Sequence, residues 1–164
     1  MIYTPYVDML DLSIETIDGR LYTMSGLGVK TLEFIVQSPE INIYYESIPG
    51  LPGLVELEST LEQRTLTGRF IFDAGEAYHF AEKRDELIAI FARDKKFYLQ
   101  ESRAVGKRWL VRLAKPFSAT QIRQYGIFEL EFISASPFSE STFLSEVNFA
   151  ENRFIFNNQG TAPI

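Results

Sequence analysis

GIFELEFISA, residues 126–135, carries the clearest secondary-structure signal in the chain. Large apolar side chains alternate there with acidic ones, Phe128, Leu130 and Phe132 on one side and Glu129 and Glu131 on the other. A period of two residues is typical of a β-strand that buries one face and exposes the other. The segment therefore predicts a half-buried strand, and the proline at position 137 marks its end.

Strand patterns recur on both sides of this segment. The predicted strands cover residues 10–17, 31–37, 41–46, 54–60, 64–72, 96–101 and 108–113, with a short extended piece at residues 153–156. Asp18–Gly19 suits a type I′ turn after the first of them. Residues 54–60 and 64–72 are expected to pair as a hairpin around Glu62. In the predicted strand over residues 31–37, Leu32, Phe34 and Val36 are expected to share one face.

One helix is predicted, over residues 76–93. An amphipathic stripe recurs there at steps of three and four residues. The stripe comprises Phe80, Arg84, Leu87, Ile88 and Phe91. Asp73 is placed to cap the amino-terminal end, and Arg93, Lys95 and Lys96 suit the negative end of the helix dipole.

The composition suits one compact domain. Of the 164 residues, 46% are hydrophobic and 23% are charged, as in ordinary globular proteins. Cysteine is absent, which excludes a disulfide framework and fits folding in a reducing cytoplasm. The first ten residues lack the features of a secretory signal, and no apolar run approaches the ~18 residues of a spanning helix. Because the formal charge is −6, we expect no specific nucleic-acid binding. We also expect no membrane insertion and no cofactor.

No strong catalytic motif is present. The single histidine, His79, lies near the start of the predicted helix and is expected to be a surface residue. Gly26–Leu27–Gly28 lacks the third glycine and the following helix of a phosphate loop, so it predicts a turn. We therefore expect no catalytic residue and no metal site. The basic cluster, which is expected to pair with acidic neighbours, comprises Arg103, Lys107, Arg108 and Arg112.

Two pairs of glutamates leave acid–base chemistry open. Glu56 and Glu58 are expected to share a face of one strand, as are Glu129 and Glu131. A spacing of two residues sets each pair about 7 Å apart, which is compatible with a two-carboxylate glycosidase. Alternation with apolar residues explains the pattern more simply as the solvated face of a half-buried strand.

Apolar residues also occupy a segment that should be a loop. Two Pro–Gly steps, at residues 49–50 and 52–53, predict a projecting loop. Exposed apolar groups in such a place mark a partner surface, whereas a loop that folds back would bury them against the core. The sequence leaves both arrangements open. The candidate interface residues are Tyr44, Tyr45, Ile48, Leu51 and Leu54.

The order of these segments points to a known family. The loop YESIPGLPG leads to the strand RTLTGRFIF, the helical segment AEKRDELIAIFARDKKFYLQ, and the strands KRWLVRLAKP and FELEFISASPF. This order resembles the N-terminal domain of the distal tail proteins of long, non-contractile-tailed bacteriophages. The likeness runs over about residues 10 to 160. The ending FIFNNQGTAPI resembles the linker by which that family enters a second, C-terminal domain.

The resemblance implies a mostly β, β-sandwich-like fold with one α-helix and an extended β-hairpin, which is α+β in strict terms. It implies a ring-forming domain over residues 1–156 and a linker over residues 157–164 toward a C-terminal domain absent from this chain. In the family, such domains form a hexameric ring at the tail tip of the virion. The ring lies between the tail tube, or proteins near the tail terminator, and the baseplate hub protein, and it encloses the DNA exit channel. C-terminal domains of many members bind carbohydrate or carry receptor-binding proteins.

The resemblance thus implies a structural, non-enzymatic protein that assembles in the host cytoplasm. An acidic surface would suit the channel, because like charge prevents DNA phosphates from sticking. The candidate channel-facing residues are Glu56, Glu58, Glu129 and Glu131. Two other functions remain open. One is a monomeric carbohydrate-binding β-sandwich that uses Trp109 or exposed tyrosines, and the other is a glycoside hydrolase that uses a glutamate pair.

Overall fold

The computed structural model describes residues 10–143 of the chain. The elements are β1 (Leu12–Thr16), β2 (Leu21–Thr23), β3 (Val29–Val36), β4 (Ile41–Glu46), β5 (Val55–Leu61), β6 (Arg64–Asp73), the 3-10 helix η1 (Ala77–His79), α1 (Phe80–Phe91), β7 (Phe97–Glu101), β8 (Lys107–Leu113), β9 (Thr120–Ile122), β10 (Tyr125–Ser134) and β11 (Glu140–Ser141). The extended piece expected at residues 153–156 and the linker expected at residues 157–164 lie outside the described residues.

The segment that gave the clearest signal forms β10, the strand around which the body is built. β10 pairs antiparallel with β6 without a break from Tyr125 to Ser134. The apolar side chains Phe128, Leu130 and Phe132 are at most 2% exposed, which confirms the predicted alternation. Burial of three large side chains on one face fixes the register, because a slip of one residue would turn all of them to solvent.

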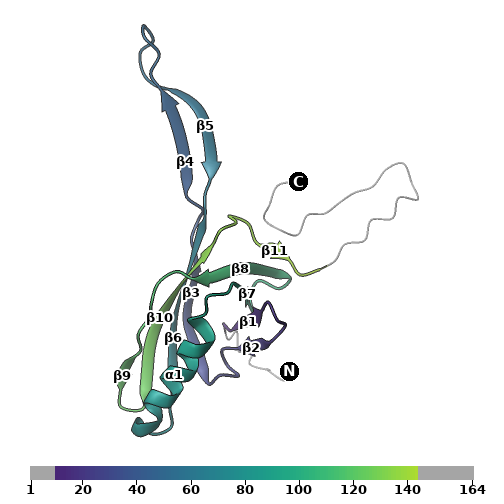
Figure 1. The fold of residues 1–164 in the computed structure, drawn as a ribbon, viewed down its shortest axis with the longest axis vertical. Coiled ribbons are helices and arrows are strands. Elements are labelled where there is room, and N and C mark those ends of the chain that lie inside the picture. Colours follow the sequence, from purple (N-terminus) through teal and green to yellow (C-terminus); the bar gives the residue numbers. More distant parts are fainter. Residues whose placement is uncertain (1–9, 144–164) are drawn as a thin grey trace, which may run out of the picture.

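One antiparallel sheet forms the body, in the order β2–β1–β7–β8–β10–β6–β3, with β9 added to β10 and β11 added to β8. The sheet bends sharply between β8 and β10. These two strands pair only at their ends, Leu113 with Phe132 and Arg112 with Ile133. Figure 1 shows β8 running across the end of the β10–β6 half, with α1 beside that half. The halves of the sheet and the helix share one core, so the predicted mostly β, sandwich-like class is confirmed.

Phenylalanine rings hold the two halves of the sheet and the helix together. The ring of Phe132 in β10 lies 5.9 Å from that of Phe97 in β7 and 6.3 Å from that of Phe91 in α1, between centroids. Phe128 stacks on Phe70 of β6 at 5.3 Å. All five rings are at most 2% exposed. Stacked and edge-to-face contacts of this kind add to the free energy that burial supplies.

The helix differs from the prediction at its apolar stripe and at its cap. Ile88 is 37% exposed, whereas Ile90 is buried. The physical reason is that Ile90 lies three residues after the buried Leu87, on the same face, while Ile88 is turned ~100° away from it. Asp73 does not cap the helix, because its carboxylate accepts the N–H of Gly75 at 2.8 Å, ahead of η1.

Two local predictions in the first strands are also wrong. The turn after β1 has a positive φ only at Gly19, at 86°, whereas a type I′ turn needs two such residues. It is a three-residue loop with glycine in the left-handed position. In β3, a bulge between Thr31 and Glu33 shifts the alternation and leaves Leu32 46% exposed, while Phe34 keeps the expected side.

β5 does not pair with β6, contrary to the prediction. β4 pairs with β5 along its whole length, and β6 pairs with β3 and β10. The physical reason is that Glu62–Gln63 offers no glycine or proline for a tight turn, whereas the Pro–Gly steps between β4 and β5 do. The β3–β6 pair therefore continues out of the body as the β4–β5 pair, joined where the Glu62 N–H donates to the Glu40 carbonyl at 2.8 Å. This unit is the extended hairpin, which is thereby confirmed.

Arg64 fixes the place where the hairpin leaves the body. Its Nε donates to the carbonyl of Gln37 at 2.6 Å, and its Nη1 donates to the carbonyl of Pro137 at 3.1 Å. The guanidinium also lies over the Trp109 ring, 4.9 Å from the centroid. One side chain thus ties the root of the hairpin to β8 and to the segment after β10, so the hairpin starts from a rigid base.

Gly68 of β6 lies under an aromatic ring. A Cβ at this position would collide with the ring of Phe70, which is fully buried. We expect Gly68→Ala to lower the free energy of unfolding by about 1–3 kcal/mol, the usual cost of overpacking a core. Urea unfolding measures this, with Thr67→Ala on the opposite face of β6 as the matched control. Equal stability of the two variants would contradict this account of the packing.

Candidate interaction surface

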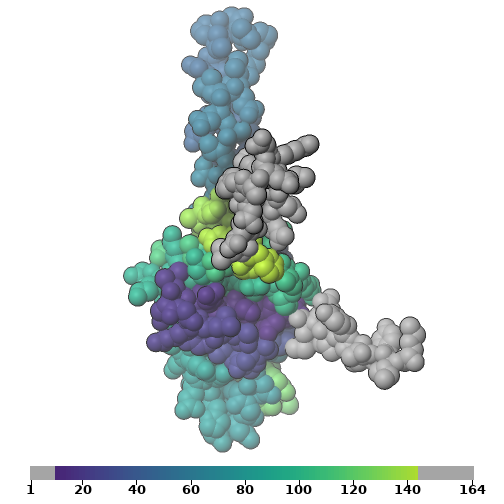
Figure 2. All heavy atoms as spheres, turned by 90° about the vertical axis from the view of Figure 1, so that its right-hand side faces the viewer, coloured from purple at the N-terminus to yellow at the C-terminus, as the bar shows by residue number. Residues whose placement is uncertain are grey.

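The β4–β5 hairpin projects from the body as a separate limb. We call residues 38–63, which comprise β4, β5, their connecting loop and the residues at its root, the arm. Figure 1 shows the arm extending from the body along the longest axis of the molecule, and Figure 2 shows it as a narrow column. The six residues of β4 alone span about 20 Å at the usual rise per strand residue. All six are exposed, so the arm adds surface to the molecule and little to its core.

Residues 47–54 form the tip of the arm. The Leu51 N–H donates to the Ile48 carbonyl at 3.1 Å, and Gly50 has a φ of 87°. With proline before that glycine, this is a type II turn. Gly53 repeats the pattern after the second proline, with a φ of 92°. The prolines and the turn bond restrict the tip, so it presents its apolar side chains in a defined way.

All five predicted interface residues are exposed. The exposed fractions are 54% for Tyr44, 52% for Tyr45, 41% for Ile48, 58% for Leu51 and 66% for Leu54. Of the two arrangements that the sequence left open, the tip therefore adopts the one that faces solvent. The sequence patterns did not identify four further exposed apolar residues, because a half-buried strand gives the same alternation. They are Ile41, Ile43, Leu57 and Leu61.

The pairing register divides the arm into two faces, because cross-strand partners point to the same side. The apolar face holds Ile41, Ile43, Tyr45, Glu56, Ser59 and Leu61, and the acidic face holds Asn42, Tyr44, Glu46, Val55, Glu58 and Thr60. A bulge sets Glu58 opposite Tyr44 but Glu56 opposite Tyr45. Adjacent tyrosines point to opposite faces, so these two glutamates do as well. The expectation that Glu56 and Glu58 share a face is therefore wrong, and the bulge is the reason.

The arm holds most of the net charge of the chain. Its residues include no lysine and no arginine, so its five glutamates give it a formal charge of −5, against −6 for the whole chain. The glutamates are Glu40, Glu46, Glu56, Glu58 and Glu62. An acidic limb without counter-charges of its own repels another limb of the same kind and attracts a basic surface.

Glu129 and Glu131 lie elsewhere, on the outer face of the body sheet. Arg69 of β6 is the register partner of Glu129. The Nζ of Lys115 lies 2.6 Å from the carboxylate of Glu131. Each of these glutamates therefore has a basic residue beside it, so this face is close to neutral and differs from the arm.

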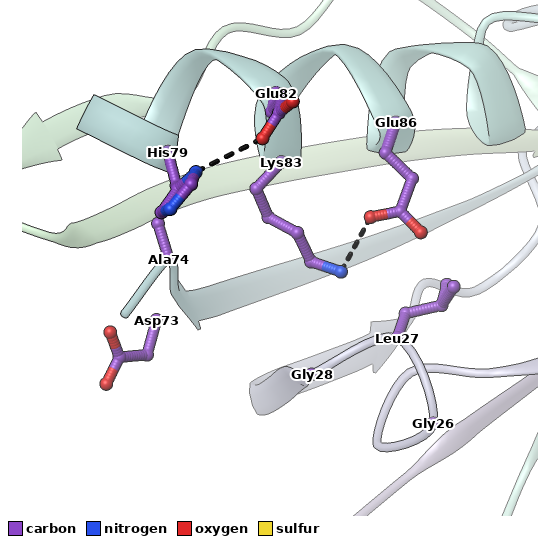
Figure 3. A pocket seen from close by; sticks show the side chains of 9 residues that line it. All are labelled: Gly26, Leu27, Gly28, Asp73, Ala74, His79, Glu82, Lys83 and Glu86. Carbon is purple, nitrogen blue, oxygen red and sulfur yellow. Dashed lines mark hydrogen bonds and ion pairs between the residues drawn. The ribbon is translucent and has the colours of Figure 1, made fainter. Parts of the chain in front are cut away.

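A hollow of about 510 Å³ lies between α1 and the Gly26–Gly28 turn, as Figure 3 shows. His79 contacts Glu82 at 3.2 Å, and Lys83 contacts Glu86 at 2.7 Å. These side chains contact one another along the helix. His79 is exposed, as predicted, and the glycine segment is a turn.

The predicted pairing of the basic cluster is confirmed for Arg108. Its guanidinium lies 3.5 Å from the carboxylates of both Glu15 and Glu140 and stacks on Tyr98, 3.7 Å from the ring centroid. Arg112 instead donates to the carbonyl of Asp94 at 3.0 Å.

Within residues 10–143, no cluster of three or more His, Asp or Glu side chains is arranged to hold a metal ion. No helix in that part of the chain has the length and apolarity needed to cross a membrane.

Known proteins share this fold. The family model for the phage tail protein RIFT-related domain matches residues 17–134. The Dit protein of phage SPP1, a paradigm of the hub adsorption apparatus in phages that infect Gram-positive bacteria, matches with a TM-score of 0.63 and 17% identity over 79% of this chain and 52% of that chain. A chain of the phage p2 baseplate, in its activated conformation with Sr, matches with a TM-score of 0.55 and 10% identity over 90% of this chain and 57% of that chain. The chain thus spans somewhat more than half the length of these solved chains. No curated protein matches it.

Polar substitutions at the tip should leave the fold intact. We expect Leu51→Ser with Leu54→Ser to change the free energy of unfolding by no more than about 0.5 kcal/mol, because both side chains face solvent. Leu66→Ser, at a fully buried position, is the matched control and should cost about 3 kcal/mol. Urea unfolding compares the two. If the tip variant lost as much stability as the control, the tip would have to pack on the body.

Proposed function

The chain belongs to the phage tail protein RIFT-related domain family, and on that premise we propose that it forms a hexameric ring at the tail tip of a long, non-contractile-tailed phage. The ring encloses the channel through which DNA leaves the particle. The chain is a Dit-like structural protein of the tail tip, where its role is to join other components and not to carry out a reaction.

The exposed apolar surface of the arm is the main support for this proposal. A ring of identical subunits uses head-to-tail contacts, in which each copy offers two different surfaces. The apolar face and the tip of the arm provide the first of them, with Ile43, Tyr45, Ile48, Leu51 and Leu54 all at least 41% exposed. Burial of such side chains against a neighbour stabilises the contact by about 25 cal/mol for each Å² of apolar area removed from water. The entropic costs of association reduce this gain.

The acidic face of the arm suits the lumen of the ring. Glu46 and Glu58 lie on it beside the polar residues Asn42 and Thr60. Negative charge there repels the phosphates of passing DNA and prevents adsorption to the wall. Glu56, on the apolar face beside the tip, is assigned to the subunit contact. Glu129 and Glu131 remain channel candidates of lower charge, because each has a basic neighbour.

The ring joins the tail tube, or proteins near the tail terminator, to the baseplate hub protein on its other side. We assign ring formation to residues 1–156 and a linker role, toward a C-terminal domain, to residues 157–164. Such a domain would carry any receptor-binding protein, while the arm and body would carry the assembly function. The protein would be made and assembled in the host cytoplasm and then reside in the virion.

Size exclusion with light scattering over a concentration series tests self-assembly. We expect a particle of about six times the 18.8 kDa chain. Ile43→Asp with Tyr45→Asp should prevent assembly, because each charge placed in a buried contact costs roughly 2 kcal/mol or more. Asn42→Asp with Tyr44→Asp, on the acidic face, is the matched control and should still assemble. A wild-type chain that stays monomeric throughout contradicts the ring, and equal behaviour of the two variants contradicts the assignment of the faces.

A further inference from the structure

We propose that the tip of the arm docks into a basic hollow on the body of the next copy of this chain, and that this contact closes the ring. The inference rests on the ring proposed above. It identifies the second surface that a head-to-tail assembly requires.

The receiving surface is a hollow of about 330 Å³ beside the β1–β2 turn and the segment that enters β7. We call it the basic hollow. Arg93, Lys95 and Lys96 line it, and Ile17, which is 60% exposed, and the buried Phe97 give it an apolar wall. Its volume lies at the lower end of the ~300–1,000 Å³ range of pockets that hold small ligands. It therefore suits the side chains of a turn better than a whole strand.

Positive charge in the basic hollow is not balanced from within the described residues. Asp18 is its one acidic lining residue, and that carboxylate lies 3.3 Å from Arg20, which is outside the lining. A hydrogen bond from the Thr16 side chain holds the pKa of Asp18 below its usual value, and the charge of Arg93 adds to this. In residues 10–143, Lys95 and Lys96 make no ion pair.

A second, smaller depression lies next to the basic hollow. Lys96 also lines a smaller groove of about 70 Å³, together with Leu110, Arg112 and Ile133. The two depressions share this lysine, so they are neighbours, and each combines apolar with basic lining residues.

The tip of the arm has the complementary chemistry. Glu46 and Glu56 flank it on the last residue pairs of the hairpin, and Ile48, Leu51 and Leu54 project from it. Apolar side chains beside two carboxylates match a hollow that combines an apolar wall with basic groups. The type II turn already orders the tip, which lowers the entropic cost of docking.

The occupant must come from another molecule. Figure 1 shows the tip at the far end of the arm, while β1 and β7, which contribute lining residues to the basic hollow, belong to the body. Two arms do not bind each other, because both are acidic and repel. In the hollow beside His79, Lys83 is already paired with Glu86, and on the outer sheet face Lys115 is already paired with Glu131. Among the surfaces described, the basic hollow is the one whose charge and shape fit the tip.

Charge reversal on each side of the contact tests the proposal. One full-length variant carries Lys95→Glu with Lys96→Glu, and the second carries Glu46→Lys with Glu56→Lys. When either variant is alone, the tip of one copy and the hollow of the next carry charges of the same sign. The protein concentration at which half of the chains are assembled should therefore rise about tenfold or more. Mixed in equal amounts, each variant offers a partner of opposite charge at both of its surfaces. The mixture should recover the wild-type mass, in particles that contain both variants.

The matched control is Lys30→Glu with Lys115→Glu, which changes the net charge of the chain equally but lies outside the basic hollow. It should assemble as the wild type does. Urea unfolding checks that each variant is folded, and the single changes Lys96→Glu and Glu56→Lys replace any double variant that is not. If the hollow variant assembles like the control, or the mixture does not recover, the docking contact is wrong and the ring stands. If the wild type itself never assembles, the ring fails and the contact fails with it.

Discussion

Continuity of two strands from the body into the arm is the constraint on which the rest of the structure depends. β6 pairs with β10 along its whole length, and the same chain runs outward as β5, while β3 continues as β4. The buried phenylalanines of β10 fix the register of the body, since a slip of one residue would expose them. Because the strands are continuous and Arg64 braces their root, that register also determines how the arm leaves the body.

Separation of charge within the chain explains why assembly should be directional. The arm carries −5 of a total of −6, while the outer face of the body sheet has Arg69 beside Glu129 and Lys115 paired with Glu131. Two acidic arms repel each other, so a symmetric arm-to-arm dimer is disfavoured and a contact between the arm and a basic part of the body is favoured. A contact between two different surfaces of one chain produces a ring when the rotation closes. The same acidic arm can then turn its other face toward DNA.

Much of the fold could be predicted from the sequence, because strands that bury one face leave a period of two. Phe128, Leu130 and Phe132 show this. Predictions failed where non-local pairing or a single extra residue decided the outcome. Bulges turned Leu32 outward and placed Glu56 and Glu58 on opposite faces, and no residue pattern indicates a bulge. The candidate interface residues are exposed, an outcome that the sequence left open. The sequence could not show the basic hollow, since Ile17 and Lys95 are brought together only by the fold.

In the proposed assembly, the arms join neighbouring copies into a closed ring around a channel. Electron cryomicroscopy of the assembled 164-residue chain would show this arrangement. We expect a closed ring in which each tip lies against Lys95 and Lys96 of the next copy, with Glu58 facing the lumen. A ring with a basic lumen, or one whose arms extend into solvent without touching a neighbour, would contradict it.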